Sequence, residues 1–316
     1  MNHLDRVQSS TVRRYAGVCA TVTVALLCGV VNIWYAARIP PGEAEYVALG
    51  SSFAAGPGDG QRAAGSYFPC MRSNVNYAHL FARQAGLKLK DVTCSGATTK
   101  HVLEGGQLLQ PAQLDAVREN TKLVTVTVGG NDVLYLGKLG AWACTNDPAD
   151  VPHAARWIGL CQGSSEAKVE QAFARLPAQM VAIVKQVHRR APAARVVFVD
   201  YTNVLPGQGT CDRLHLSDAE AEEGRLLAAR LAAVTAEAAR KTNSGLVQAS
   251  EITRGHDVCS AEPWVYGFQF PEGFLTFGAA PFHPRETAMQ RIADELSRQY
   301  VSSSSSRHAT AWDVHP

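Results

Sequence analysis

Four short segments of the chain carry side chains that together could perform acyl transfer. They read GSSF at 50–53, CSGATT at 94–99, GGND at 129–132 and PFHP at 281–284. A serine nucleophile needs a base that accepts its proton and hydrogen-bond donors that stabilise the developing oxyanion. Ser51 or Ser52 offers the hydroxyl, and His283 offers the base. The backbone N–H of Gly96 and the side-chain amide of Asn131 are donors of the kind that an oxyanion hole requires.

The first three segments each follow an apolar or β-branched run that predicts a β-strand, at 46–50, 87–93 and 123–128. Helical and strand patterns then alternate, with helices expected at 74–85, 165–189, 217–241 and 284–300 and strands at 195–201 and 245–250. This alternation predicts an α/β fold, a three-layer α/β/α sandwich around a central, mainly parallel five-stranded sheet. Sites in such folds form at the carboxyl edge of the sheet, where the three segments should meet.

The four segments, in this order, resemble the sequence blocks of the SGNH, or GDSL, family of serine hydrolases, over about residues 45–300. The resemblance implies that Ser52 is the nucleophile and His283 the base. It also implies that the Ser52 and Gly96 N–H groups and the Asn131 amide form the oxyanion hole. The expected activity is an esterase or lipase acting on acyl esters or lipids, with no metal ion and no organic cofactor.

Two positions depart from the family pattern. Ser51 stands where the family has an aspartate before the nucleophile, and Ala280 stands where it has an aspartate three residues before the base. We expect the backbone carbonyl of Ala280 to accept the Nδ1–H of His283, which fixes the useful tautomer without supplying a negative charge. A carboxylate from the preceding loop remains an alternative, and the candidates are Asp257, Glu262 and Glu272. We expect Ser51 and Asp132 to hold loops through hydrogen bonds.

Three functions fit these residues. The first is hydrolysis of a carboxylic ester through an acyl-enzyme. The second is transfer of the same acyl group to a hydroxyl of a sugar or lipid. The third is a catalytically inactive domain that binds a ligand, for which Ser51 and Ala280 would be signs of decay. Labelling of Ser52 by a fluorophosphonate distinguishes the third from the first two.

The N-terminal segment 15–37 contains no charged residue and follows Arg13 and Arg14, so it predicts either a transmembrane anchor or a cleaved signal segment. In the first case residues 1–14 remain in the cytoplasm. Both cases place the hydrolase domain (45–300) outside the cytoplasm, membrane-anchored or secreted, after a linker at 38–44. The serine-rich segment 301–316 is expected to be disordered. A net charge of +2 with no basic run argues against nucleic acid as a partner.

Six cysteines lie outside the apolar segment, and an even number in an exported domain predicts three disulfides. The sequence alone leaves their pairing open. The resemblance to the secreted bacterial branch of the family implies that neighbours pair, as Cys70–Cys94, Cys144–Cys161 and Cys211–Cys259. No CxxC motif occurs, so we expect no zinc site. The long insertion 134–165 follows the asparagine loop and is expected to be either a wall or lid of the site or an excursion without function.

Overall fold

The computed structural model describes residues 44–148, 151, 156, 161–269 and 280–309. Contacts divide the chain into one compact unit of Pro41–Ala64 and Phe68–Pro316 and another of Met1–Pro40 and Gly65–Tyr67. The fold below is that of the first unit. The anchor or signal segment predicted at 15–37 lies outside the described residues, as does the stretch before it. Within the part that is described, no helix is both long and apolar enough to cross a bilayer.

The centre of the fold is a sheet of five strands in the order β2-β1-β3-β4-β5. The strands are β1 (Tyr46–Gly50), β2 (Leu89–Asp91), β3 (Leu123–Thr127), β4 (Arg195–Val199) and β5 (Gly245–Val247). All four neighbouring pairs are parallel, which confirms the predicted sheet. Gly50 pairs with Thr127 at the carboxyl ends of the two central strands, so the segments that follow β1 and β3 begin side by side.

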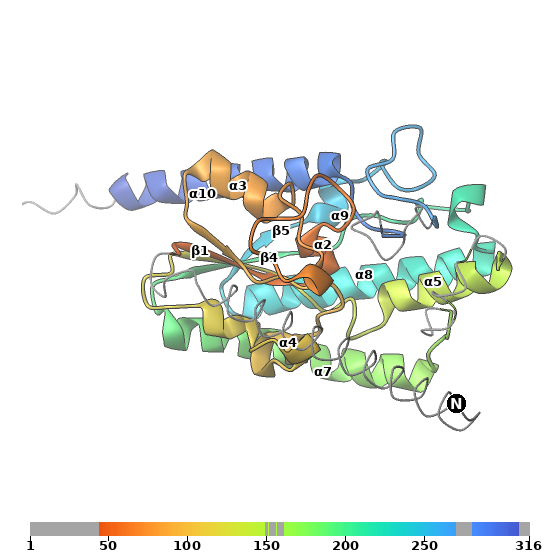
Figure 1. Ribbon diagram of the computed structural model, residues 1–316, viewed down its shortest axis with the longest axis horizontal. Helices are drawn as coiled ribbons and strands as arrows, with labels where there is room; N and C mark the ends of the chain where they lie inside the picture. The colour runs from red at the N-terminus through yellow and green to blue at the C-terminus, as the bar shows by residue number, and fades with distance from the viewer. Residues whose placement is uncertain (1–43, 149–150, 152–155, 157–160, 270–279, 310–316) are drawn as a thin grey trace, which may run out of the picture. The chain divides into compact units, whose positions relative to one another are not determined.

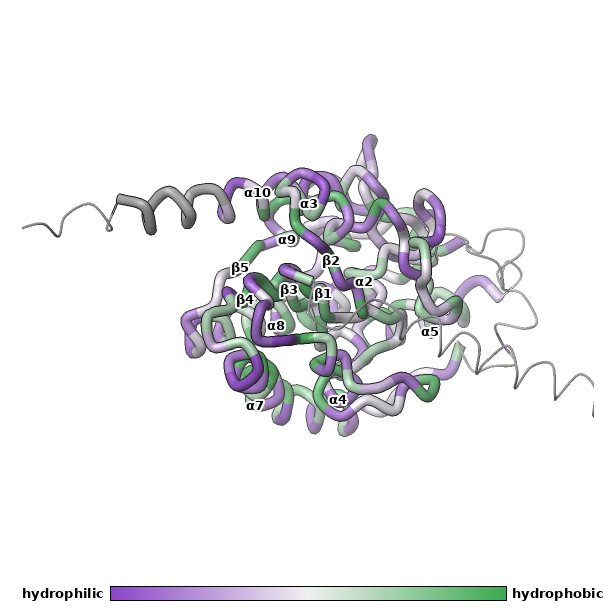
Figure 2. The backbone as a smooth tube through the Cα atoms, turned by 60° about the vertical axis from the view of Figure 1, so that its left-hand side comes forward, coloured by the Kyte–Doolittle hydropathy of each residue, from purple (hydrophilic) through white to green (hydrophobic). Residues whose placement is uncertain are grey.

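Alternate side chains of each strand point into separate layers of apolar packing. On β1, Tyr46 and Ala48 pack with α3 (Tyr77–Ala85) and α10 (Glu286–Ala309), whereas Val47 and Leu49 pack towards α7 (Glu166–Arg190) and α8 (Asp218–Lys241). Figure 1 shows α3 and α10 on one side of the strands and α7 and α8 on the other. In Figure 2 the tube around β3 and β4, in the middle of the fold, is largely green, which marks hydrophobic residues. The three-layer sandwich is therefore confirmed.

The remaining helices are short or were not expected from the sequence. They are α2 (Ser52–Ala55), α4 (Thr99–Glu104), α5 (Tyr135–Asn146) and α9 (Ala249–Ile252), with 3₁₀ turns at Phe68–Cys70, Gln107–Leu109, Gln113–Ala116 and Asp212–Leu214. Helix α5 occupies the first part of the insertion 134–165, for which the sequence analysis predicted no helix. Its Lys138 is buried and forms an ion pair with Glu223 of α8, so this part of the insertion packs on the sandwich.

The last helix differs from its prediction at its C-terminal end. It was expected to end at Tyr300, but α10 continues to Ala309 and so includes residues 301–309 of the tail that we expected to be disordered. Serine is a moderate helix former, and extending a helix already anchored by Met289, Ile292 and Leu296 needs no new nucleation. Residues 310–316 lie outside the described part of the chain.

The disulfides join neighbours in sequence, as the resemblance implied. Their Cα–Cα distances are 4.1 Å for Cys70–Cys94, 5.4 Å for Cys144–Cys161 and 5.7 Å for Cys211–Cys259. The first links the segment after α2 to the loop that carries Gly96. The two loops that contain the candidate nucleophile and an oxyanion donor are thus covalently braced.

Gly50 ends β1 in a conformation that requires glycine. Its φ is +144°, and a Cβ atom there would lie 2.3 Å from the carbonyl oxygen of Thr127. Gln113 fixes the same residue: its Oε1 accepts the Gly50 N–H at 2.7 Å and its Nε2 donates to the Gly50 carbonyl at 3.0 Å. The end of the strand can therefore turn sharply into Ser51 and Ser52.

We expect Gly50→Ala to lower the free energy of unfolding by about 3 kcal/mol, because the new methyl group meets backbone that cannot move away. Gly86→Ala is the matched control, since Gly86 also has a positive φ, +64°, but open space around it. The control should lose only about 1 kcal/mol. Urea unfolding curves of both variants measure the difference, and equal losses would show that the Thr127 contact is unimportant.

Candidate active site

Ser52 lies at the point where β1 gives way to α2. Ser51 is the N-cap of this short helix and Ser52 its first residue, so the chain reverses from strand to helix at the sheet edge. The Ser51 N–H donates to the Thr127 carbonyl at 2.9 Å, which extends the pairing of β1 and β3 to the turn itself. Ser52 is 8% exposed, and its Oγ lies 2.7 Å from Nε2 of His283. The structure therefore brings together two residues that are 231 positions apart.

The tautomer of His283 follows from its two contacts. Its Nδ1 lies 2.8 Å from the carbonyl oxygen of Pro281, and a carbonyl can only accept, so Nδ1 carries the hydrogen. Nε2 of the neutral ring is then an acceptor for the Ser52 hydroxyl hydrogen. His283 is half-buried against the ring of Phe53, with centroids 5.1 Å apart. Desolvation of the imidazole lowers the pKa of His283 to about 4.

The group that holds the His283 ring is not the one we expected. The Ala280 carbonyl accepts the backbone N–H of His283 at 3.2 Å, and it is the Pro281 carbonyl that accepts from the ring. Phe282 has a φ of +64°, and the tight turn through it presents the Pro281 carbonyl, rather than that of Ala280, to Nδ1. The carbonyl that accepts from Nδ1 is therefore that of Pro281, while a weaker hydrogen bond to the Ala280 carbonyl also acts to raise the pKa of His283.

Of the carboxylates considered as alternatives, the two in the described residues, Asp257 and Glu262, do not hydrogen-bond the His283 ring. Asp257 accepts the backbone N–H of Cys259 at 2.8 Å. No aspartate or glutamate of the described residues hydrogen-bonds the His283 ring, and none contributes to its pKa shift. Glu272 lies outside the described residues.

The three candidate oxyanion donors stand on two loops and the start of α2. Within the described parts of the chain, the backbone N–H groups of Ser52 and Gly96 have no acceptor. Gly96 is exposed and has a φ of +81°. The Asn131 side chain donates one N–H to the Ala97 carbonyl at 2.9 Å, and an amide has a second N–H to offer. This bond fixes Asn131 beside the loop that carries Gly96.

Asp132 and Ser51 form hydrogen bonds that hold these loops, as expected. Asp132 accepts from both the backbone N–H and the hydroxyl of Thr99, at the first residue of α4, and its burial raises its pKa. The Ser51 Oγ lies 3.3 Å from the hydroxyl of Tyr201, which accepts the Gly130 N–H at 2.8 Å. Tyr201, which lies two residues after the end of β4, therefore joins the turn at Ser51 to the loop that carries Gly130 and Asn131.

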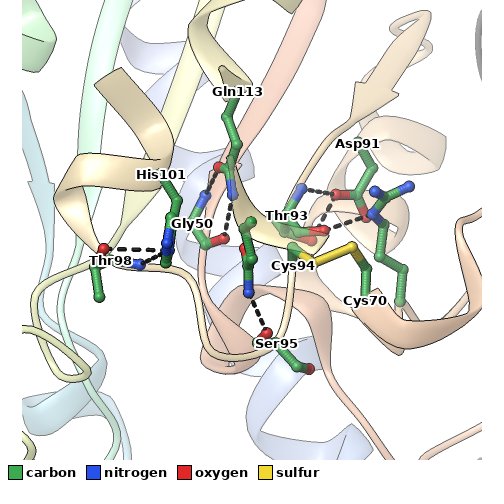
Figure 3. Close-up of a disulfide and its surroundings, with 11 residues drawn as sticks. Gly50, Cys70, Asp91, Thr93, Cys94, Ser95, Thr98, His101 and Gln113 are labelled. Atoms are coloured by element: carbon green, nitrogen blue, oxygen red, sulfur yellow. Dashed lines mark hydrogen bonds between the residues drawn. A yellow bond between two sulfur atoms is a disulfide. The ribbon is translucent and has the colours of Figure 1, made fainter. Parts of the chain in front are cut away.

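Figure 3 shows the brace around the Gly96 loop. The Cys70–Cys94 disulfide lies on one side of Ser95, and Gln113 holds the end of β1 at Gly50. The Ser95 N–H donates to the Cys70 carbonyl at 3.1 Å, while the Ser95 carbonyl accepts from the side chain of Gln107 at 2.7 Å. Hydrogen bonds from two different segments therefore hold Ser95, the residue directly before Gly96.

A further pair of residues joins the histidine loop to the serine loop. Tyr266 pairs with the histidine loop through its backbone: its N–H donates to the His283 carbonyl at 2.9 Å and its carbonyl accepts from Phe282 at 3.1 Å. The Tyr266 hydroxyl donates to Oδ1 of Asp59 at 2.5 Å, and Asp59 follows α2 in the chain. Neither residue, nor Tyr201 or Gln113, was singled out from the sequence, because isolated polar residues in loops carry no pattern that marks them.

The described residues contain no group of three or more His, Cys, Asp or Glu side chains that could hold a metal ion. The site consists of a serine, a neutral histidine and free N–H donors at the carboxyl edge of a parallel sheet. An arrangement of this kind has the groups that nucleophilic acyl transfer requires.

Comparison with known proteins identifies the family of the chain. Residues 48–291 match the GDSL-like lipase/acylhydrolase family, and the chain belongs to that family. It is 30% identical over 228 residues to a lipase from Streptomyces rimosus, covering 72% of this chain and 78% of the relative. It is 28% identical over 265 residues to lipase 2 from Streptomyces coelicolor, covering 79% and 83%. The protein is a carboxylic ester hydrolase.

Two solved structures show the same fold. An extracellular lipase from Streptomyces rimosus superposes with a TM-score of 0.60 and 25% identity, over 80% of this chain and 99% of the lipase. A phospholipase A1 from Streptomyces albidoflavus superposes with a TM-score of 0.62 and 24% identity, over 80% and 99%. Both covered fractions include most of the sandwich described above.

Proposed function

We propose that the protein is an extracytoplasmic esterase or lipase in which Ser52 and His283 hydrolyse acyl esters as a dyad. The observation that carries this proposal is the 2.7 Å contact between Ser52 Oγ and His283 Nε2, with Nδ1 bonded to the Pro281 carbonyl. A nucleophile within hydrogen-bond reach of a base that a third group orients is the signature of covalent acyl transfer. Here the third group is a neutral carbonyl.

In the first half-reaction, Ser52 Oγ attacks the acyl carbon while its proton passes to His283 Nε2. The resulting imidazolium is held by the Pro281 carbonyl through Nδ1–H. The negative charge that develops on the substrate oxygen is received by the N–H groups of Ser52 and Gly96 and by the free N–H of Asn131. Donors fixed before the reaction stabilise this charge without reorganisation, which lowers the barrier. His283 then gives its proton to the departing alcohol.

In the second half-reaction, water repeats the attack on the acyl-Ser52 ester. His283 Nε2 accepts a proton from the water and returns it to Ser52 Oγ as the acid leaves. The same groups therefore serve twice, and no other reactant is required. Hydrolysis and transfer to an alcohol differ only in which hydroxyl attacks the acyl-enzyme. Product analysis of p-nitrophenyl ester turnover with an added alcohol acceptor tests this part of the proposal: carboxylic acid as the main product supports hydrolysis, and ester as the main product supports a transferase.

The disulfides support an extracytoplasmic location. Disulfides form and persist in oxidising compartments, and two of the three join loops that carry or flank the site. The lipase from Streptomyces rimosus with the same fold is extracellular. Its lipid ester substrates, and those of the phospholipase A1, are the substrate class we propose for this chain.

The pH dependence of activity tests how His283 is held. His283 must be neutral to act as a base, and its lowered pKa keeps it neutral down to about pH 4. We expect kcat/KM of the wild type to fall only as the pH drops towards 4. Ala280→Asp places a carboxylate near the ring, favours the imidazolium and should move this acid limb upward by about 1 to 3 pH units.

Ala280→Asn is the matched control, because an amide of the same size carries no charge. It should leave the acid limb where the wild type has it. The proposal is contradicted if kcat/KM of the wild type already falls near pH 6.5 or above and Ala280→Asp does not move this fall. Such a result would show that a negative charge already acts on His283.

A further inference from the structure

Exposed apolar side chains gather on the segments that brace the Gly96 loop. Leu109 is 85% exposed, Leu108 47% and Phe68 49%, which makes them three of the four large apolar side chains with this degree of exposure among the described residues. The fourth, Leu226, is 63% exposed and lies on α8. Exposed leucine tips are common singly, but a group of them beside a site indicates an interaction surface.

Two hydrogen bonds place these side chains around the Gly96 loop. Gln107, next to Leu108, donates its side-chain N–H to the Ser95 carbonyl at 2.7 Å. Cys70, two residues after Phe68, accepts the Ser95 N–H at 3.1 Å. The leucines and the phenylalanine therefore lie on segments that flank Ser95 on its two sides. Ser95 directly precedes the oxyanion donor Gly96.

The backbone keeps the two leucines exposed at a conformational cost. Leu108 has a φ of +49° and Leu109 a φ of +62°, and two consecutive non-glycine residues in the left-handed region are unusual. Such strain persists only where the surrounding structure imposes it, and it clusters at functional sites. Here Gly106 and Gln110 close the turn, with a backbone hydrogen bond of 2.9 Å.

Charge decides what kind of partner this surface fits. The stretch 105–114 contains no charged residue, and neither does 63–71. The guanidinium of Arg62 lies 5.8 Å from the centroid of the Phe68 ring, so one positive charge stands at the edge of this surface. A surface of two leucines and a phenylalanine with one flanking arginine is suited to a lipid layer without net charge, such as phosphatidylcholine, whose apolar region takes the apolar side chains and whose phosphates can meet the arginine. Insertion there would bring the oxyanion loop to the depth at which lipid ester bonds lie.

We infer that Leu108, Leu109 and Phe68 form a lipid-docking rim that inserts into a lipid–water interface and delivers aggregated ester substrates to Ser52. The inference rests on the proposed esterase or lipase function for its second half. The docking itself is a property of the surface and needs no catalysis. Soluble esters reach Ser52 without it.

The test compares the double variant Leu108→Ser/Leu109→Ser with Leu226→Ser, in which an equally exposed leucine is lost away from the rim. Binding to phosphatidylcholine vesicles is measured by co-sedimentation, and hydrolysis is measured on soluble p-nitrophenyl butyrate and on vesicle-borne phosphatidylcholine. The double variant should lose at least about tenfold in vesicle binding and in turnover of the vesicle-borne ester. Its turnover of the soluble ester, and every property of Leu226→Ser, should stay within about twofold of the wild type.

Ser52→Ala separates this inference from the proposed function, because it should bind vesicles as the wild type does while hydrolysing nothing. Wild type that binds vesicles but cleaves no ester would refute the enzymatic proposal alone. The docking inference is overturned if the double variant binds vesicles normally, or if wild type ignores phosphatidylcholine. It is also overturned if the wild type is a dimer that the double variant dissociates, since the rim would then join two copies of the chain.

Discussion

Ser52→Ala is expected to lower kcat/KM for a p-nitrophenyl ester by at least about 10⁴-fold, since it removes the atom that forms the acyl-enzyme. The remaining oxyanion donors can still polarise the substrate carbonyl, so a low residual rate above that of water should persist. Steady-state kinetics of the purified hydrolase domain measure the change. Thermal unfolding should be nearly unaffected, because the Ser52 hydroxyl makes no other hydrogen bond among the described residues.

Ser51→Ala provides the control for this result. Ser51 is 1% exposed and its hydroxyl contacts Tyr201 rather than His283. Loss of this hydrogen bond should loosen the link to the Gly130 loop and reduce kcat by about tenfold or less. A loss in Ser51→Ala as large as that in Ser52→Ala, with an unchanged fold, would mean that the wrong serine has been assigned as the nucleophile.

His283→Gln is expected to lower kcat/KM by about as much as Ser52→Ala does. Without Nε2 as a base, the Ser52 hydroxyl keeps its proton at neutral pH and attacks slowly. Because the two groups act as one unit, the double variant Ser52→Ala/His283→Gln should be no slower than either single variant. The same kinetic assay measures all three proteins.

This non-additivity is the diagnostic part of the prediction. If the fold-decrease in kcat/KM of the double variant instead equalled the product of the two single fold-decreases, Ser52 and His283 would be acting independently. A small loss in His283→Gln would point to a different base. Circular dichroism of each variant shows whether the fold is retained, because His283 also packs against Phe53.

The elements that position the site could be predicted because their patterns are local. The strand before Ser52 and the one before Gly129 are continuous apolar runs that stop at glycine, and parallel strands place such stops at one edge. The residues Ser52, Gly96, Asn131 and His283 were recognisable as a set through the family resemblance. Their types and order, rather than any one of them, carried the information.

The parts that could not be predicted depend on tertiary contacts or on single dihedral angles. Which carbonyl faces the His283 ring depends on the left-handed conformation of Phe282, and nothing in the letters PFHP fixes it. The link from Asp59 to Tyr266 joins residues 207 positions apart. Helix α5 was missed because Gly137 and Gly140 lower the helix propensity of its sequence, whereas packing against α8 stabilises it.

A neutral carbonyl in place of a carboxylate has a consequence for the range of conditions in which the enzyme works. The imidazolium formed during the reaction gains less stabilisation, which costs rate. In return His283 stays unprotonated in moderately acidic surroundings, where a histidine paired with aspartate would be blocked as a base. The site therefore suits the extracytoplasmic location that we propose, where the cytoplasm does not buffer the pH.

The most direct test of the central claim is covalent labelling of the purified domain with a fluorophosphonate, followed by mass spectrometry of the labelled peptide. We expect stoichiometric modification of Ser52, no modification of Ser52→Ala, and much slower labelling of His283→Gln. Labelling of another residue, equal labelling of Ser52→Ala, or no labelling of the folded wild type would contradict the claim that Ser52 is a nucleophile activated by His283.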